Sequence, residues 1–328
     1  MERIKYKNHI KKIILVLFLF IISACQVKIP KTTQDLTISL TYIPNIQFAP
    51  FYVALDKGYF ESNGLKVSLN YGNEADLVAL VGSGNQKFMI ASGEQILLSR
   101  AQGLPVVYVA AWYEDYPVGV VSLKSQGISN PQDLEGKTIG IPGLYGASYI
   151  GFKALQEAAG LADTEISLES IGFTQVEAIM GEQTDAAVIY VANEPVQLRS
   201  LGYDVNLLRV SDYLDLVGNG LVTNEETIKN EPELVSKVTQ AVLKGIDYTA
   251  KHPDEAYDIC TRYVENLAQA DKTIQMQVLS ESIQLWQTQQ LGYSDMNGWE
   301  NMQQLLINIG LMQNPVDLSL AFTNDFID

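Results

Sequence analysis

Few side chains in this sequence could act as a catalytic acid, base or nucleophile. The 328 residues include two histidines, His9 and His252, and the second is followed directly by Pro253. The two cysteines are Cys25 and Cys260, too few for a metal site built on thiolates. Because no pair of nucleophile and base is visible, we predict no catalytic residue, no metal site and no cofactor. We therefore expect a binding protein and not an enzyme.

Side chains suited to binding stand in the loop after the first strand pattern, at Tyr42, Asn45 and Phe48. Aromatic faces stack on flat heteroaromatic rings, and an amide can hydrogen-bond a ring edge. We expect Tyr42 or Phe48 to form a stacking wall and Asn45 to bond the ring. The alternative is that Phe48, with Phe51 and Tyr52, only packs one face of a helix.

A carboxylate and an aromatic pair follow two later strand patterns. Ser92-Gly93-Glu94 follows a buried run and begins a helix, where the helix dipole favours negative charge. We expect Glu94 to accept hydrogen bonds from a ligand, or else to cap the helix. Trp112 and Tyr113 open an aromatic and acidic loop that could form one wall of a cleft. The alternative is a surface loop anchored by the tryptophan.

The loop Gly143-Leu-Tyr145-Gly146-Ala-Ser148 precedes a helical pattern. Glycines permit close backbone approach, and N–H groups at a helix start bind oxygens or anions. We predict that Tyr145, Gly146 and Ser148 bind ligand, with Tyr145 closing over it from the opposite side. The loop lacks the Gly-Lys-Ser/Thr ending of a nucleotide-binding P-loop, so a nucleotide ligand is disfavoured.

Three more candidates follow another strand pattern, and a fourth stands within a later one. Tyr190, Asn193 and Glu194 come after the apolar run that ends at Tyr190, and Asn219 stands in a later run. Ligands of open α/β sheets lie beyond the carboxyl ends of strands, which is the main reason for choosing these residues. The alternatives are a helix-start charge for Glu194 and a hinge position for Asn219.

The elements that must position these residues alternate between strand and helix patterns, which indicates an α/β fold with a mainly parallel sheet. After residue 231 the chain is almost entirely helical. The predicted strands are 36–42, 65–71, 88–91, 106–112, 118–123, 138–141, 167–171, 186–190, 206–210 and 216–223, and the predicted helices are 47–55, 75–82, 94–102, 149–159, 232–251, 254–264, 272–286 and 299–311.

The N-terminus has the pattern of a secretory signal. Lys11 and Lys12 precede the apolar run from Ile13 to Ile22, and Ser23-Ala24-Cys25 follows. Ile22-Ser-Ala-Cys25 resembles the bacterial lipobox, so we predict a signal peptide at 1–24, a lipid on Cys25 and a polar tether at 25–35. The alternative, a transmembrane anchor, needs roughly 20 apolar residues, more than this run supplies.

The charge balance limits the possible partners. The net charge is −16, and it becomes −20 when the five basic residues and one acidic residue of the signal are removed. Nucleic-acid binding needs a basic footprint, so we exclude it. We expect a monomer that touches the membrane only through its lipid, outside the cytoplasm.

Two segments of the sequence carry a resemblance to a known family. The first is Tyr42-Ile-Pro-Asn45-Ile-Gln-Phe48, which continues to Lys57-Gly-Tyr-Phe-Glu61, and the second is Asp133-Leu-Glu-Gly-Lys137-Thr-Ile-Gly-Ile. Both resemble the thiamine-pyrimidine-synthase-like group of solute-binding proteins. The resemblance covers residues 36–251. It implies the two-lobed type II periplasmic binding protein fold, with lobe 1 from 36–120 and 222–328, lobe 2 from 121–221, and the helical C-terminal portion packed on the first lobe.

The resemblance also implies a role. Most bacterial members deliver a ligand to an ABC importer permease, and this sequence looks closest to those that bind riboflavin or thiamine-pathway pyrimidines. Two alternatives stay open: a pyrimidine-synthase-like enzyme, or a binder of another family ligand such as a sulfonate. The synthases of the eukaryotic branch consume an internal histidine and carry a cysteine-rich loop, and this sequence departs from that pattern. We expect closure of the two lobes on the ligand.

Overall fold

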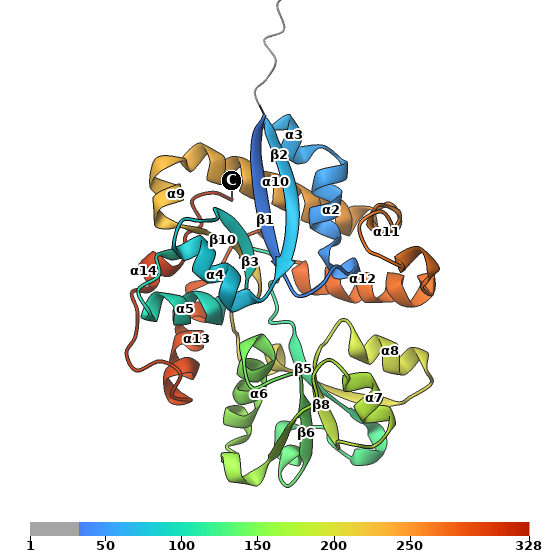
Figure 1. Cartoon of the computed structure of the whole chain (residues 1–328). Helices are drawn as coiled ribbons and strands as arrows, with labels where there is room; N and C mark the ends of the chain where they lie inside the picture. Colours follow the sequence, from blue (N-terminus) through green and yellow to red (C-terminus); the bar gives the residue numbers. More distant parts are fainter. Residues whose placement is uncertain (1–32, 328) are drawn as a thin grey trace, which may run out of the picture. The chain divides into compact units, whose positions relative to one another are not determined.

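The computed structural model describes residues 33–327, and the unit considered below begins at Asp35 (Figure 1). The predicted signal peptide, Cys25 and most of the tether lie outside the described residues. Within residues 33–327, no helix combines the length and the apolar character needed to cross a membrane.

The strands form two five-stranded sheets. The first has the order β2-β1-β3-β10-β4, with β1 parallel to β3 and β10 antiparallel to both of its neighbours. The second has the order β7-β6-β8-β5-β9, with β5 antiparallel to both of its neighbours. The bounds are β1 Gln34–Thr41, β2 Leu65–Gly72, β3 Phe88–Ala91, β4 Val106–Ala111, β5 Val118–Leu123, β6 Thr138–Ile141, β7 Ser167–Ser170, β8 Ala186–Tyr190, β9 Val205–Arg209 and β10 Gly220–Asn224.

Helices cover both sheets, and we call each sheet with its helices a lobe. The central strand β3 is buried at every position, which explains why Phe88–Ala91 is an unbroken apolar run. The helices of the first lobe that precede β5 are α2 Ala49–Asp56, α3 Tyr59–Ser62, α4 Glu74–Gly82 and α5 Gly93–Ala101, and those of the second are α6 Gly146–Ala159, α7 Gln175–Met180 and α8 Glu194–Ser200.

The C-terminal helices return to the first lobe. Helix α10 packs on α2 and α3, α13 packs on α5, and α12 also contacts α8 of the second lobe. Gly245 permits the close crossing of α10 and α2, because a Cβ there would lie 2.2 Å from the carbonyl oxygen of Pro50. The bounds are α9 Glu225–Asn230, α10 Pro232–Lys251, α11 Pro253–Cys260, α12 Lys272–Trp286, α13 Met296–Asn308 and α14 Leu318–Ala321.

The α/β class and the helical portion on the first lobe are confirmed. Two element bounds differ from the predicted ones in ways that concern the candidate site. Helix α6 begins at Gly146 and not at residue 149, and β10 begins at Gly220 and not at residue 216. The segment before Gly220 instead belongs to a connection between the two sheets. The lobe boundaries stay a prediction.

Candidate functional site

The topology makes one edge of each sheet face the other. The carboxyl ends of β1, β3 and β4 share an edge with the amino end of β10, and those of β6, β8 and β9 share an edge with the amino end of β5. Residues 112–117 connect β4 to β5, and residues 210–219 connect β9 to β10. Because both connections leave from these two edges, every candidate residue stands near the junction of the lobes, where ligands of such folds bind.

Tyr42 lies at the end of β1 and contacts the second lobe. Its φ is +74°, a left-handed conformation that costs a bulky residue energy. Its ring lies 5.0 Å from that of Phe173, measured between centroids, with an interplanar angle of 60°. Phe173 follows β7, so this pair joins residues from the two lobes. Both rings keep substantial exposure, at 43% for Tyr42 and 64% for Phe173.

Asn45 has a local structural role. Its side-chain oxygen accepts a hydrogen bond from the Gln47 N–H at 2.8 Å, and its amide donates to the Ile43 carbonyl at 3.1 Å. It therefore caps the short 3₁₀ turn Ile46–Phe48. The side chain is half-buried, so part of it faces solvent.

Phe48, Trp112 and Tyr113 pack together in an apolar cluster beneath the edge. The Trp112 ring lies 5.6 Å from Phe48 and 4.7 Å from Tyr113, between centroids, and 5.7 Å from Trp286 of α12. All three candidates are buried. The packing alternative therefore describes Phe48 in this structure, and Tyr42 is the more open of the two rings proposed as a stacking wall.

Glu94 is fully buried and shares one hydroxyl with a second carboxyl. Ser92 Oγ lies 2.6 Å from Glu94 Oε1 and 2.8 Å from Glu74 Oε1, and the Ser92 N–H donates to the same Glu74 oxygen at 2.7 Å. A hydroxyl has one proton, so it cannot donate to both carboxylates. Burial and the negative charge of Glu74 raise the pKa of Glu94 to about 8. We therefore assign the extra proton to Glu94, which donates to Ser92, which donates to Glu74.

Tyr116 connects this group to the second lobe. Its hydroxyl donates to the Ala147 carbonyl in α6 at 3.0 Å and lies 3.4 Å from Glu94 Oε2. Tyr116 stands in the first connection between the sheets and is buried. The position of α6 is thus coupled through one hydroxyl to the buried carboxyl pair.

The three candidates near the start of α6 differ in exposure. Tyr145 is the residue before the helix and is 67% exposed, so it is free to close over a ligand. Gly146 has φ +65°, which explains why a glycine begins this helix. Ser148 is half-buried in the first turn, where N–H groups lack helical partners. The sequence had placed Gly146 and Ser148 in a loop.

Glu194 is held at the start of α8 by its own segment. It accepts hydrogen bonds from the Tyr190 N–H at 3.0 Å and from the Asn193 side chain at 2.9 Å. Burial raises the pKa of Glu194 to about 7 in spite of these donors. Asn193 in turn accepts from Gln197 at 3.0 Å, which fixes its amide. The three residues therefore form one organised group at the end of β8.

Carboxyl groups of each lobe raise the pKa of a tyrosine in the other lobe. Burial raises the pKa of Tyr190 well above its usual value, and the charges of Glu74 and Glu94 in the first lobe raise it further. Burial and the charge of Glu194 in the second lobe likewise raise the pKa of Tyr42. Candidates chosen from distant parts of the sequence are thus close enough to interact across the junction.

Two buried polar atoms at the first edge have no hydrogen-bond partner within residues 33–327. They are Trp112 Nε1, a donor, and Asn219 Oδ1, an acceptor. The backbone carbonyl of Asn219 accepts from the Trp112 and Tyr113 N–H groups, each at 3.0 Å, so the two segments are adjacent. Unpaired buried donors and acceptors are costly, and a ligand is one way to satisfy them.

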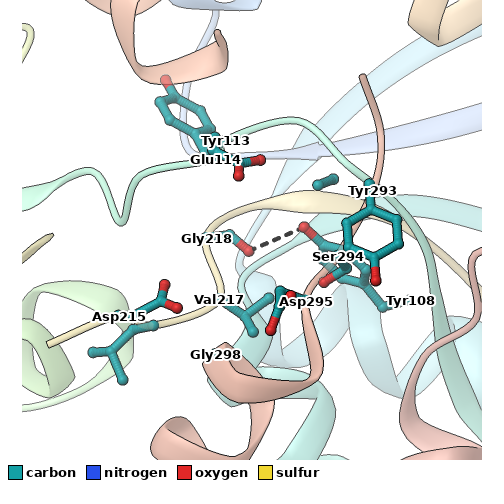
Figure 2. Close-up of a pocket in the computed structure, with 12 residues that line it drawn as sticks. Tyr108, Tyr113, Glu114, Asp215, Val217, Gly218, Tyr293, Ser294, Asp295 and Gly298 are labelled. Atoms are coloured by element: carbon teal, nitrogen blue, oxygen red, sulfur yellow. Dashed lines mark hydrogen bonds between the residues drawn. The ribbon is translucent and has the colours of Figure 1, made fainter. Parts of the chain in front are cut away.

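Figure 2 shows a small pocket beside these connections, with Tyr113, Glu114, Asp215 and Asp295 among the labelled residues. Its volume is about 60 Å³. Pockets for drug-sized ligands occupy roughly 300–1,000 Å³, so a flat bicyclic or tricyclic ring does not fit here. Tyr113 is the one sequence candidate that lines it. The pocket is therefore separate from the group around Tyr42, Tyr190 and Glu194.

Sequence reasoning missed Glu74 and Phe173 at the junction, and it did not single out Tyr116 within the aromatic and acidic loop that begins at Trp112. The signal for Glu74 was available, because Gly72-Asn73-Glu74 places a carboxylate at a helix start after a strand, as Ser92-Gly93-Glu94 does. Phe173 and Tyr116 carried no such local signal, since their roles depend on which segments meet in space.

The family model described as "NMT1/THI5 like" matches residues 45–256. The riboflavin-binding protein RibY of Chloroflexus aurantiacus is 38% identical over 90% of this chain and 87% of its own length. The formylaminopyrimidine-binding protein of Halalkalibacterium halodurans is 28% identical over 96% and 98%. A 4-amino-5-hydroxymethyl-2-methylpyrimidine phosphate synthase of Legionella pneumophila is 24% identical over 89% and 92%.

Solved structures support the fold. The periplasmic aliphatic sulphonate binding protein SsuA of Escherichia coli matches with a TM-score of 0.72 at 13% identity, over 88% of this chain and 92% of that one. At this identity the likeness speaks for the architecture alone. The fold is that of the two-lobed periplasmic binding proteins, as the sequence predicted.

Proposed function

The chain belongs to the NMT1/THI5-like family, and we propose that it is the substrate-binding lipoprotein of an ABC importer. Its ligand is a flat heteroaromatic vitamin or precursor, bound between lobe 1 (36–120 and 222–328) and lobe 2 (121–221). The lipid on Cys25 holds it at the outer face of a membrane. Closure of the lobes presents the ligand to the permease.

The observation that carries this proposal is the crosswise arrangement at the junction of the lobes. Tyr42 of the first lobe interacts with Glu194 of the second, and Tyr190 of the second interacts with Glu74 and Glu94 of the first. Aromatic faces and a few hydrogen-bonding groups from opposed walls are what a flat ring with polar edges requires.

Among such ligands we favour riboflavin over a thiamine-pathway pyrimidine. The relative named for riboflavin binding is 38% identical, and the one named for formylaminopyrimidine binding is 28% identical. The preference has a direct test, because flavin fluorescence is quenched by stacking on aromatic side chains. The test uses the protein from Gln26 onward, which lacks the signal and Cys25.

The experiment is a parallel titration with riboflavin and with 4-amino-5-hydroxymethyl-2-methylpyrimidine, followed by thermal unfolding and, for riboflavin, by fluorescence. A ligand that binds only the native state raises the melting temperature, by an amount that grows with its concentration above Kd. We expect a shift and quenching with riboflavin. A shift with the pyrimidine alone moves the ligand to the thiamine pathway, and no shift with either contradicts the vitamin assignment.

A synthase is the second candidate, because a relative carries that name. We propose binding in its place for a structural reason. His252 is exposed, lies between α10 and α11 and contacts Tyr248 at 4.3 Å between ring centroids, away from the edges where the candidates meet. Mass spectrometry of the protein after incubation with the cofactors of pyrimidine synthesis checks this: modified His252 together with a pyrimidine product would support the synthase.

The lipoprotein part has its own test. In cells fed an alkyne-labelled fatty acid, the full chain should take up label and remain with the membrane fraction. Cys25→Ser should abolish the labelling, whereas Cys260→Ser should retain it, since Cys260 is buried and free. Labelling of the Cys25→Ser variant would refute lipid attachment at that residue.

A further inference from the structure

We propose that the cleft selects its ligand by charge, taking neutral or cationic hydrogen-bond donors and rejecting phosphorylated and sulfonated molecules. This inference rests on the proposed function and deepens it, because it names the charge class of the ligand and the residues that decide it. These residues are Glu74, Glu94 and Glu194, which we call the carboxyl triplet.

The carboxyl triplet acts on one space from both lobes. Glu74 begins α4 and Glu94 lies in the first turn of α5 in the first lobe, and Glu194 begins α8 of the second. Glu194 accepts a hydrogen bond from the Tyr190 N–H at 3.0 Å, and Glu94 lies 3.4 Å from the Tyr116 hydroxyl, which donates to Ala147 of the second lobe. Burial, and the charges of the triplet after it, raise the pKa of Tyr190. A ligand held against Tyr190 therefore lies near carboxyl groups of both lobes.

No ion pair offsets these charges within residues 33–327. The ion pairs that lysines and arginines form in that range are with other carboxylates, and none involves a member of the triplet. Arg209, at the carboxyl end of β9, is placed at the same edge but faces acidic groups of its own. It lies 4.0 Å from Glu281, and its charge partly opposes the rise that burial causes in the pKa of Asp115.

The hydrogen-bond inventory also favours a neutral ligand. Glu74 and Glu194 accept hydrogen bonds, and Asn219 Oδ1 is a buried acceptor without a partner in the described structure, with the residue 7% exposed. Trp112 Nε1 is the corresponding unpartnered donor, with the residue 3% exposed. A ring edge carrying both an N–H and a carbonyl or ring nitrogen supplies a donor for Asn219 and an acceptor for Trp112.

A phosphate or sulfonate group has the opposite character, because it carries only acceptors at neutral pH and a full negative charge. Placed near an ionised Glu74, in a site where water is excluded, it meets repulsion that is stronger than in bulk water. Proteins that capture such anions use arginine, lysine or helix N-termini. Here the first turns of α4, α5 and α8 carry glutamates instead, and an ionised Glu74 offsets the positive end of α4.

The experiment compares two matched pairs of ligands at pH 7.5 with the protein from Gln26 onward. The first pair is riboflavin and its 5′-phosphate, and the second is 4-amino-5-hydroxymethyl-2-methylpyrimidine and its phosphate. Within the pair that binds, we expect the neutral ligand to bind at least about 100-fold more tightly than its phosphate. Glu74→Gln and Glu194→Gln should each reduce this ratio of the two affinities about tenfold. Glu169→Gln, an exposed carboxyl on β7, is the matched control and should leave the ratio unchanged.

The failure of this inference is distinguishable from the failure of the proposed function. Binding of a neutral ligand with an equal affinity for its phosphate overturns charge selection and leaves the vitamin-binding role intact. If both glutamine variants are folded by circular dichroism and still show the large ratio of affinities, the assignment to the carboxyl triplet is overturned. If neither neutral member binds and a phosphorylated or sulfonated molecule does, both proposals are overturned.

Discussion

Tyr42 and Phe173 bring the two lobes into ring-to-ring contact at 5.0 Å, although one follows β1 and the other follows β7. Both side chains stay partly open to solvent, at 43% for Tyr42 and 64% for Phe173. Aromatic pairs contribute roughly 0.5–1.5 kcal/mol beyond the area they bury. We therefore infer that the contact biases the separation of the lobes only weakly.

We predict that Phe173→Ala shifts the ligand-free protein toward larger separation of the lobes, by roughly 2–10-fold in the populations, the equivalent of about 0.5–1.5 kcal/mol. Small-angle X-ray scattering should record a larger radius of gyration. Leu201→Ala is the control, because Leu201 is an exposed apolar residue of the second lobe at the end of α8. An unchanged radius in Phe173→Ala would show that the pair does not restrain the lobes.

The two tryptophans Trp112 and Trp299 allow the cost of an unpaired N–H to be measured. Trp299 Nε1 donates to Ser294 Oγ at 2.8 Å, whereas Trp112 Nε1 has no partner among the described residues. Replacement by phenylalanine removes similar volume from two buried positions. We predict that Trp299→Phe destabilises the fold by about 1–2 kcal/mol more than Trp112→Phe, because only the former loses a hydrogen bond. Urea unfolding of both variants checks this, and equal losses would mean that Trp112 is satisfied.

Much of the architecture could be predicted because it depends on local pattern. The helix expected over 232–251 begins and ends as predicted, since its apolar spacing, Pro232 near its start and His252 before Pro253 are all local signals. The order of strands and helices was accessible for the same reason. The start of β10 was not, because Leu216 and Val217 are buried by contacts of the connection between sheets and not by strand pairing.

The candidate site was predictable by residue type and only partly by arrangement. Strand ends identified Tyr42, Tyr190 and Glu194, and their interactions join the two edges. The burial of Trp112 and Phe48 was an alternative that the sequence left open, because it depends on Trp286 of α12 packing against the same cluster. Local sequence gives the chemistry at each strand end, whereas the side chain that covers it comes from a distant segment.

Gly93 and Gly298 both lie against Val217 of the second connection. Alanine substitutions at these two glycines therefore form a matched pair. A Cβ at Gly93 would lie 2.5 Å from Val217 Cβ and 2.8 Å from its carbonyl oxygen, whereas a Cβ at Gly298 would lie 3.4 Å from Val217 Cγ2. We predict that Gly93→Ala destabilises the fold by about 1–3 kcal/mol through overpacking. Gly298→Ala, inside α13, should be neutral or stabilising by up to about 1 kcal/mol. Thermal unfolding measures both, and the opposite order would mean that the connection moves freely away from α5.

The shared proton of Ser92, Glu74 and Glu94 predicts how stability depends on pH. The pKa of Glu94 is raised to about 8 in the folded protein, by burial and by the charge of Glu74, and it returns to an ordinary carboxyl value on unfolding. Between those values the folded state binds more protons than the unfolded state, so stability falls as the pH rises through this range. The stabilising effect of the proton is complete below about pH 4.5 and is lost as the pH rises through about 8.

Glu94→Gln tests this directly, because glutamine keeps the shape and can donate to Ser92 without titrating. We predict that the melting temperature of the parent protein falls between pH 5.5 and pH 8.5 and that the variant falls less, with a difference of about 1–3 kcal/mol at the upper pH. Glu169→Gln, which removes an exposed carboxyl, should follow the parent curve. If Glu94→Gln also follows the parent curve, Glu94 is ionised in the folded protein, and the proton that joins the two carboxyls must then reside on Glu74.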